Sequence, residues 1–88
     1  MNNSELYAFL QGGWHHTEII TDGDNRTIYQ GKTCAAANSD DLPVWCVKRT
    51  TIRVIGGAQT IDEMFADGNM DFDNIWSNRA NLTYKFLI

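Results

Sequence analysis

The run VWCVKRTTIRVI, residues 44–55, is followed by Gly56-Gly57 and then by TIDEMFA, residues 60–66. The first run is rich in Val, Ile and Thr, which fit the pleated surface of a strand. The two glycines turn the chain, and the run that follows them is long enough to return as a pairing partner. This stretch therefore predicts a long strand, a tight turn and an antiparallel strand.

A second hairpin is expected nearer the N-terminus. Residues 17–21 and 26–31 flank Asp22-Gly23-Asp24-Asn25, whose residue types tolerate the positive φ of tight hairpin turns. Residues 32–37 are predicted to continue the second arm. Pro43 cannot donate a backbone hydrogen bond, so it belongs at a strand entrance or an edge.

The C-terminal quarter predicts a turn and a final strand. Asp67-Gly68-Asn69 has the composition of a turn. Beyond it, apolar residues alternate with polar ones, which predicts a half-buried strand. The apolar positions are Leu82, Tyr84, Phe86 and Ile88.

Helical signals are short. Ser4 can cap residues 6–10, which fit a helix or a strand. Between Asp71 and Ala80, apolar residues spaced three and four apart predict a short helical turn. We expect its Phe72 and Trp76 to fill one end of a sheet or barrel, and Arg79 to pair with Asp71 or Asp73.

Together these elements predict an all-β fold. Five or six short strands follow one another as hairpins, and no helix is long enough to cross over a parallel sheet. A single exposed sheet would leave one face wet and its edges unpaired. The sequence therefore predicts a small antiparallel β-sandwich or partly open barrel, with residues 1–88 forming a single domain.

Composition allows one thin core. The chain has 88 residues, among them three Trp, three Tyr and four Phe. Large rings supply most of the burial in a core this small, and they are also enriched at protein interfaces. Both interpretations of the aromatic residues stay open, with the core preferred.

The charge balance argues against nucleic acid as the main partner. The net charge is −4, and the basic residues Lys48 and Arg49 point to opposite faces of a strand. The first residues lack a secretory leader, and no apolar run reaches membrane-spanning length. We therefore expect that the protein is made in a bacterial cytoplasm and does not associate with a membrane.

The two cysteines are expected to be reduced core residues. If the connection 38–43 is centred near Asp40 and Asp41, Cys34 lies opposite Val47 or its neighbour, and Cys34 and Cys46 come close in space.

Three patterns could carry chemistry, and each is incomplete. Asp67, Asn69, Asp71 and Asp73 alternate like the early ligands of a calcium loop, but the glycine and the bidentate glutamate that such a loop needs are missing. His15-His16 has no further ligand at a conventional spacing. No nucleophile is linked to a base by spacing. We therefore predict no enzyme, no cofactor and no catalytic or metal-binding residue, and leave cation binding by residues 67–73 open.

Four segments between Trp45 and Tyr84 form a pattern through their order and spacing. They are Trp45-Cys46-Val47-Lys48-Arg49, Phe65-Ala66-Asp67-Gly68, Phe72-Asp73-Asn74-Ile75-Trp76 and Arg79-Ala80-Asn81-Leu82-Thr83-Tyr84. This order resembles a family of short tailed-bacteriophage proteins and domains encoded among virion structural genes. The resemblance covers nearly half of the chain and implies a virus particle as the setting.

The resemblance and the small all-β fold favour a non-enzymatic structural component of a virion, such as a head decoration, tail or fibre-associated protein. The alternative is a small soluble phage effector or inhibitor that binds a host protein. Expected partners are the chain itself, as a dimer or trimer with its C-terminal strand in or beside the interface, and other virion proteins. Candidate interaction or structural residues are Trp45, Asp67, Asn69, Phe72, Trp76, Arg79, Tyr84, Phe86 and Ile88.

Overall fold

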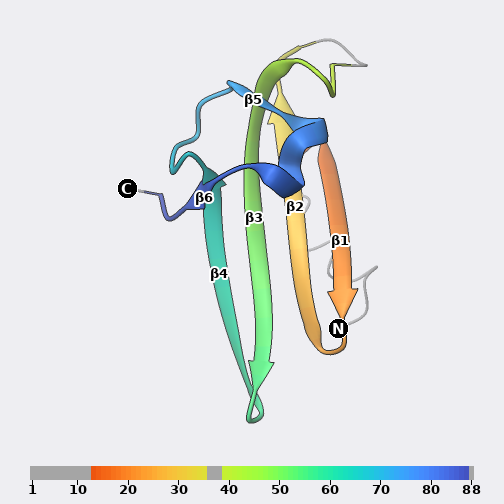
Figure 1. Cartoon of the computed structure of the whole chain (residues 1–88), viewed down its shortest axis with the longest axis vertical. Coiled ribbons are helices and arrows are strands. Elements are labelled where there is room, and N and C mark those ends of the chain that lie inside the picture. Colours follow the sequence, from red (N-terminus) through yellow and green to blue (C-terminus); the bar gives the residue numbers. More distant parts are fainter. Residues whose placement is uncertain (1–12, 36–38, 88) are drawn as a thin grey trace.

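The computed structural model describes residues 13–35 and 39–87. The expected element at residues 6–10 and the candidate residue Ile88 lie outside this part. The described strands are β1 (His16–Asp22), β2 (Asn25–Thr33), β3 (Pro43–Ile55), β4 (Ala58–Ala66), β5 (Asn74–Ile75) and β6 (Tyr84–Lys85), with a 3₁₀ helix, η1 (Trp76–Asn81), after β5. They form one antiparallel sheet in the order β1-β2-β3-β4-β6, and β5 pairs with β3 (Figure 1).

Both predicted hairpins are confirmed. Asp22 pairs with Asn25 across the first turn, and Ile55 pairs with Ala58 across the second. Gly56 and Gly57 have φ values of 58° and 82°, which suit the two-residue turns that match the twist of the flanking strands. β3 begins at Pro43, as predicted.

The pairing of β2 with β3 differs from the prediction. β2 ends at Thr33, and Gly31 rather than Cys34 lies opposite Val47. Cys34 therefore lies past the end of the strand and is exposed, while Cys46 is fully buried as predicted. Both thiols are free.

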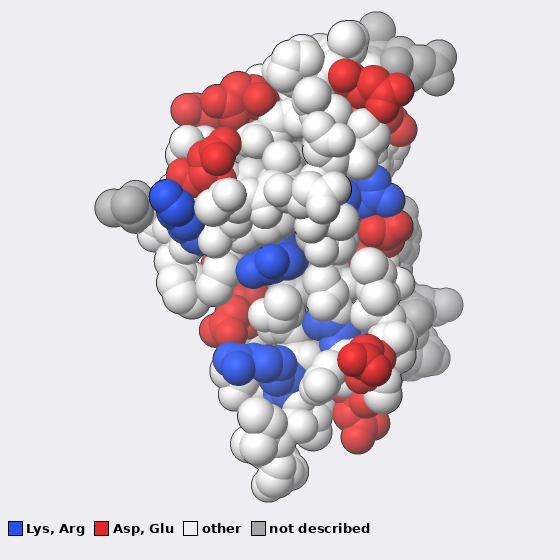
Figure 2. All heavy atoms as spheres, viewed as in Figure 1, with Lys and Arg blue, Asp and Glu red and all other residues white. Residues whose placement is uncertain are grey.

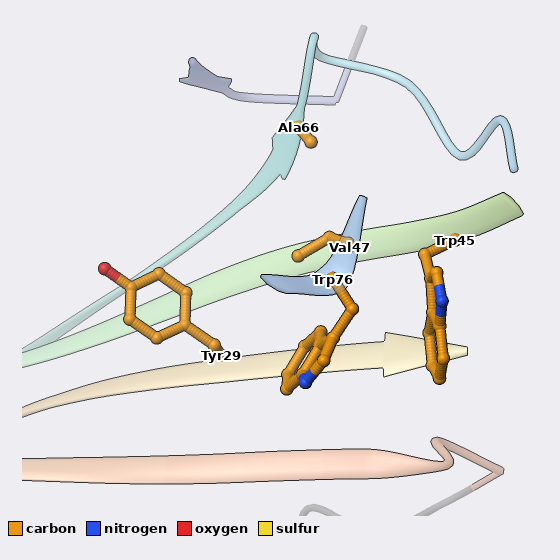
Figure 3. Close-up of a cluster of buried hydrophobic side chains, with 5 residues drawn as sticks. All are labelled: Tyr29, Trp45, Val47, Ala66 and Trp76. Carbon is orange, nitrogen blue, oxygen red and sulfur yellow. The ribbon is translucent and has the colours of Figure 1, made fainter. Parts of the chain in front are cut away.

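One face of the sheet carries the main hydrophobic cluster. Tyr29, Val47 and Trp45 point to this face from β2 and β3, and Ala66 joins them from β4. β5 and η1 cross this face (Figure 1), and Trp76 lies over β2 between Tyr29 and Trp45 (Figure 3). The short helical turn thus covers part of this face.

The opposite face also has a buried centre. Its fully or nearly buried residues are Ile28, Gln30, Cys46, Thr50 and Phe65. The Trp14 ring lies over this face, with the Nζ atoms of Lys32 and Lys48 at 4.8 and 4.6 Å from its centroid. Such cation–π contacts draw the start of the described chain onto the sheet.

The all-β antiparallel class and the short helical turn are confirmed, and the described strands form one open sheet. The prediction for the last strand is wrong in extent, because β6 contains only Tyr84 and Lys85. Phe86 and Leu87 are 58% and 48% exposed. Phe86 lines a shallow hollow with Asp62 and Met64 of β4 and Thr51 of β3, so its ring is only partly covered by the sheet.

Candidate functional site

Trp45 and Arg79, two of the residues that the sequence singles out, contact the Trp76 ring, and Gly31 makes room for it. A Cβ atom added at Gly31 would lie 2.6 and 2.8 Å from Cε3 and Cζ3 of Trp76, and 3.0 Å from Cε3 of Trp45. A glycine inside a strand marks such a close approach. Trp76 is 7% exposed, so the predicted filling of one end of the sheet is confirmed for this residue.

Phe72 does not share this role. It is 43% exposed, although the sequence predicts it beside Trp76 in the core. The prediction fails because helical geometry begins only at Trp76, so the spacing of four residues does not place both rings on one side.

Trp45 and His16 extend the aromatic cluster toward the end of β1. Trp45 is 2% exposed, and its indole Nε1 donates to the carbonyl of Ser39 at 2.9 Å. The His16 ring stacks on Trp45 with centroids 4.7 Å apart, and lies 5.2 Å from the Trp76 ring. Asp40 Oδ1 lies 3.0 Å from His16 Nε2. These contacts fasten the 39–42 connection over the cluster.

Arg79 fixes η1 to the edge strand β1. Its Nε and Nη2 donate to Oε1 and Oε2 of Glu18 at 2.9 and 2.8 Å, and its guanidinium lies 4.7 Å from the Trp76 ring centroid. The predicted pairing with Asp71 or Asp73 is therefore wrong. Hydrogen bonding to Arg79 lowers the pKa of the Glu18 carboxyl, and the same contact raises the pKa of Arg79.

Tyr84 joins the C-terminal segment to η1 and β3. Its hydroxyl donates to the carbonyl of Arg79 at 2.7 Å, and the guanidinium of Arg49 lies 4.6 Å from its ring centroid. Burial, together with the neighbouring Tyr29, raises the pKa of the Tyr84 phenol. The phenol therefore stays neutral and able to donate.

The turn at residues 67–69 is built for backbone geometry. Asp67 has a φ of 60° and Gly68 a φ of 73°, so both occupy the left-handed region. The Oδ1 of Asn69 accepts a hydrogen bond from the backbone of Asp71 at 3.0 Å. Within residues 13–35 and 39–87, no three His, Cys, Asp or Glu side chains gather closely enough to hold a metal ion.

The possible catalytic groups point to different places. His15 Nδ1 accepts from the Thr33 backbone at 3.0 Å, whereas His16 turns toward Asp40. Burial raises the pKa of the Cys46 thiol, which disfavours a nucleophilic thiolate. Within the described residues, His15 and His16 thus hold segments of the chain together.

Some key residues carry no recognisable signal in the sequence. Glu18 and His16 contact residues of β3, the loop and η1 that are far away in the chain, so no local spacing reveals them. Gly31 is the exception, because a lone glycine within a strand pattern indicates a close approach.

Charge is spread over the face that carries η1. Figure 2 shows Lys and Arg atoms interspersed with Asp and Glu atoms, without a continuous basic area on the face drawn. The strand pair Lys48 and Arg49 divides as predicted, since Lys48 contacts Trp14 on one face and Arg49 contacts Tyr84 on the other.

Within residues 13–35 and 39–87, no helix is both long and apolar enough to cross a membrane. No protein-family model, curated protein or solved structure matches the chain. The similarity of residues 45–84 to a tailed-phage family therefore stays a prediction.

Proposed function

We propose that this protein is a non-enzymatic structural component of a tailed-phage virion, acting through contacts with copies of itself and with other virion proteins. The observation that carries the proposal is a set of exposed apolar side chains along the β4 side of the sheet. Its members are Ile55, Ile61, Phe86 and Leu87, which are 69%, 60%, 58% and 48% exposed. They are spread along this side, with Ile61 in the middle of β4, Ile55 at the hairpin end, and Phe86 and Leu87 after β6, so they accompany an unpaired stretch of strand that can bind a protein.

The residues that hold the fold together differ from those that are exposed for contacts, which supports this function. Trp45, Trp76, Arg79 and Tyr84 are engaged in holding η1 against the sheet. Exposed apolar residues outside this arrangement remain for contacts, among them Ile61 on β4 and Phe86 in the C-terminal segment. A sheet edge and apolar side chains suit a protein partner. The unpaired N–H and C=O groups of the edge can hydrogen-bond to the partner's backbone, and the apolar side chains exclude water from the contact.

The phage setting comes from the resemblance of residues 45–84, and the contact surface comes from the geometry. In a symmetric particle, each copy is surrounded by neighbours that can cover an exposed edge. Such a role needs only the open β4 side of the sheet as a contact surface.

Quantitative peptide mass spectrometry on purified particles of the source virus tests the proposal. Copies of this chain are counted against the major capsid protein, with a host cytoplasmic protein as the measure of contamination. A fixed ratio well above that contaminant supports a virion component, and its value separates a many-copy decoration from a few-copy tail or fibre part. Absence from particles combined with abundance in infected cells would contradict the proposal and favour a soluble effector.

A further inference from the structure

β4 is paired with another strand along the whole of one edge and along only part of the other edge. β3 pairs with residues 58–65 of β4, whereas β6 pairs only with Phe65 and Ala66. Within the described part of the chain, no strand pairs with the outer side of residues 58–64, which we call the free edge of β4. Unpaired backbone groups on such an edge are able to bind another strand.

The direction of the backbone groups on the free edge follows from its neighbours. The N–H of Asp67 donates to Thr83 at 2.8 Å, on the β6 side. In an antiparallel sheet, the backbone groups of every second residue point to the same side. The N–H and C=O groups of Gln59, Ile61 and Glu63 therefore point outward, while those of the residues between them pair with β3.

We propose that the free edge of β4 binds the same edge of a second copy of this chain, antiparallel, around a two-fold axis at Ile61. Ile61 of one copy then lies opposite Ile61 of the other, and Gln59 lies opposite Glu63. This inference rests on the self-association in the proposed function and names its surface and register.

The length of the free edge favours this register. Residue 61 is the midpoint of residues 58–64, so the pairing ends with Ala58 of the second copy opposite Met64. The pairing therefore stops at Met64, one residue before Phe65, which is already paired with β6. All three outward-pointing residues of each copy find partners, and β6 is not displaced.

Charge excludes the neighbouring registers on the C-terminal side. An axis at Asp62 or at Glu63 would place two identical carboxylates directly opposite each other, which is destabilising. An axis at Thr60 would leave Glu63 opposite the turn residue Gly57 of the second copy, so outward groups at the strand end would lose ladder partners. The axis at Ile61 instead sets each Glu63 opposite the amide of Gln59.

Acidic residues on an edge strand often prevent pairing, but here they are held by cations on β3. Asp62 Oδ2 accepts from Arg53 Nη2 at 2.8 Å, and Glu63 Oε2 lies 3.6 Å from Lys48 Nζ. Their charges are partly balanced within the same copy.

Apolar contacts add to the backbone pairing. Ile61, 60% exposed, meets its own counterpart at the axis. The Gly56-Gly57 turn of the second copy reaches the point where β6 leaves the edge, which brings the exposed Ile55 toward Phe86. The same pairing thus covers several of the exposed apolar residues along this side.

Site-directed cross-linking tests the register. Ile61→Cys, in a Cys34→Ser background, should form a disulfide-linked dimer under mild oxidation, because directly opposite hydrogen-bonded residues have Cα atoms about 5.5 Å apart. Gln59→Cys and Glu63→Cys, on the same face and edge, are matched controls. Each lies about 14 Å from its counterpart in this register, so neither should cross-link alone, whereas an equal mixture of the two should.

Sedimentation velocity gives a second readout. Ile61→Lys places two ammonium groups together at the axis and should shift the protein to monomer, whereas Ile20→Lys on the opposite edge strand should not. Both positions are exposed, at 60% and 47%, so both variants should keep the fold. A wild-type protein that stays monomeric at every concentration, without Ile61→Cys cross-linking, overturns the inference. Equal cross-linking by Gln59→Cys also overturns it.

These results are separable from those for the proposed function. A cross-linked dimer that is missing from particles contradicts the virion role and leaves the β4 pairing intact. A fixed copy number in particles without pairing at Ile61 supports the virion role and rejects the β4 pairing.

Discussion

Arg79 donates two hydrogen bonds to the two carboxylate oxygens of Glu18, at 2.9 and 2.8 Å, across 61 residues of chain. The pair joins η1 to the edge strand β1 and keeps Trp76 over the sheet. Among the described strands β1 pairs with β2 alone, so this contact is a long-range link between the N-terminal hairpin and the C-terminal segment.

Removing the charge of Glu18 should weaken the fold in a pH-dependent way. Its folded pKa is lowered, so its contribution is fully present above the ordinary pKa of glutamate and is lost as the pH falls through the folded value. Glu18→Gln should lower the free energy of unfolding by about 1 kcal/mol or less at neutral pH, because the pair is partly exposed.

Urea unfolding at neutral and acid pH measures this effect. The difference between wild type and Glu18→Gln should shrink in acid, and Asp41→Asn provides a charge-matched control at an exposed carboxylate. A difference that stays constant between neutral and acid pH would show that the carboxylate charge is not what stabilises the contact.

Trp76 and Phe72 should differ sharply in their effect on stability. Trp76→Ala removes a buried ring and should cost about 3–5 kcal/mol. Phe72→Ala affects a ring that is 43% exposed and should cost less than about 1 kcal/mol. Denaturant midpoints followed by circular dichroism make the comparison, and Trp76→Phe keeps a measurable folded state. Equal costs for the two alanine variants would contradict the assignment of Trp76 to the core.

Gly31→Ala should displace the Trp76 ring, because the new methyl group would lie 2.6 Å from Cε3 of that ring. The cost should fall when Trp76 is also replaced by Leu, whose smaller side chain leaves room. A double-mutant cycle of unfolding free energies measures the coupling. Additive costs would mean that Trp76 is not the obstacle at Gly31.

The two thiols should react at very different rates. Cys34 is exposed, whereas Cys46 is fully buried and its pKa is raised by burial. In the native protein, Ellman's reagent should label Cys34 quickly and Cys46 only on the timescale of opening. Cys34→Ser should abolish the fast phase. A fast phase that persists in Cys34→Ser would contradict the burial of Cys46.

The hairpins could be predicted from sequence because their signals are local. Gly56-Gly57 and the Asp22–Asn25 cluster lie between the strands that they join, so turn chemistry and strand composition agree. Trp76 could be assigned to the core for a related reason, since a large ring in a small protein has few other places to go.

The rest depends on contacts between distant parts of the chain. The register of β2 with β3 was beyond local reasoning, because the 39–42 connection is drawn toward Trp45 by the indole hydrogen bond to Ser39. Gly31 lies opposite Val47, where the sequence predicts Cys34, so the observed register of β2 differs from the predicted one by three residues. Likewise, Arg79 has nearby carboxylates in sequence, but η1 turns it toward Glu18.

Hydrogen exchange of the β4 amides, followed by NMR over a concentration series, tests most directly the claim that this protein works through its free sheet edge. The amides of Thr60 and Asp62, which pair with β3, should be protected at every concentration. Those of Gln59, Ile61 and Glu63 should exchange rapidly in dilute solution and become protected as concentration rises, and Ile61→Lys should remove only this second protection. Rapid exchange of these three amides at every concentration would contradict the claim.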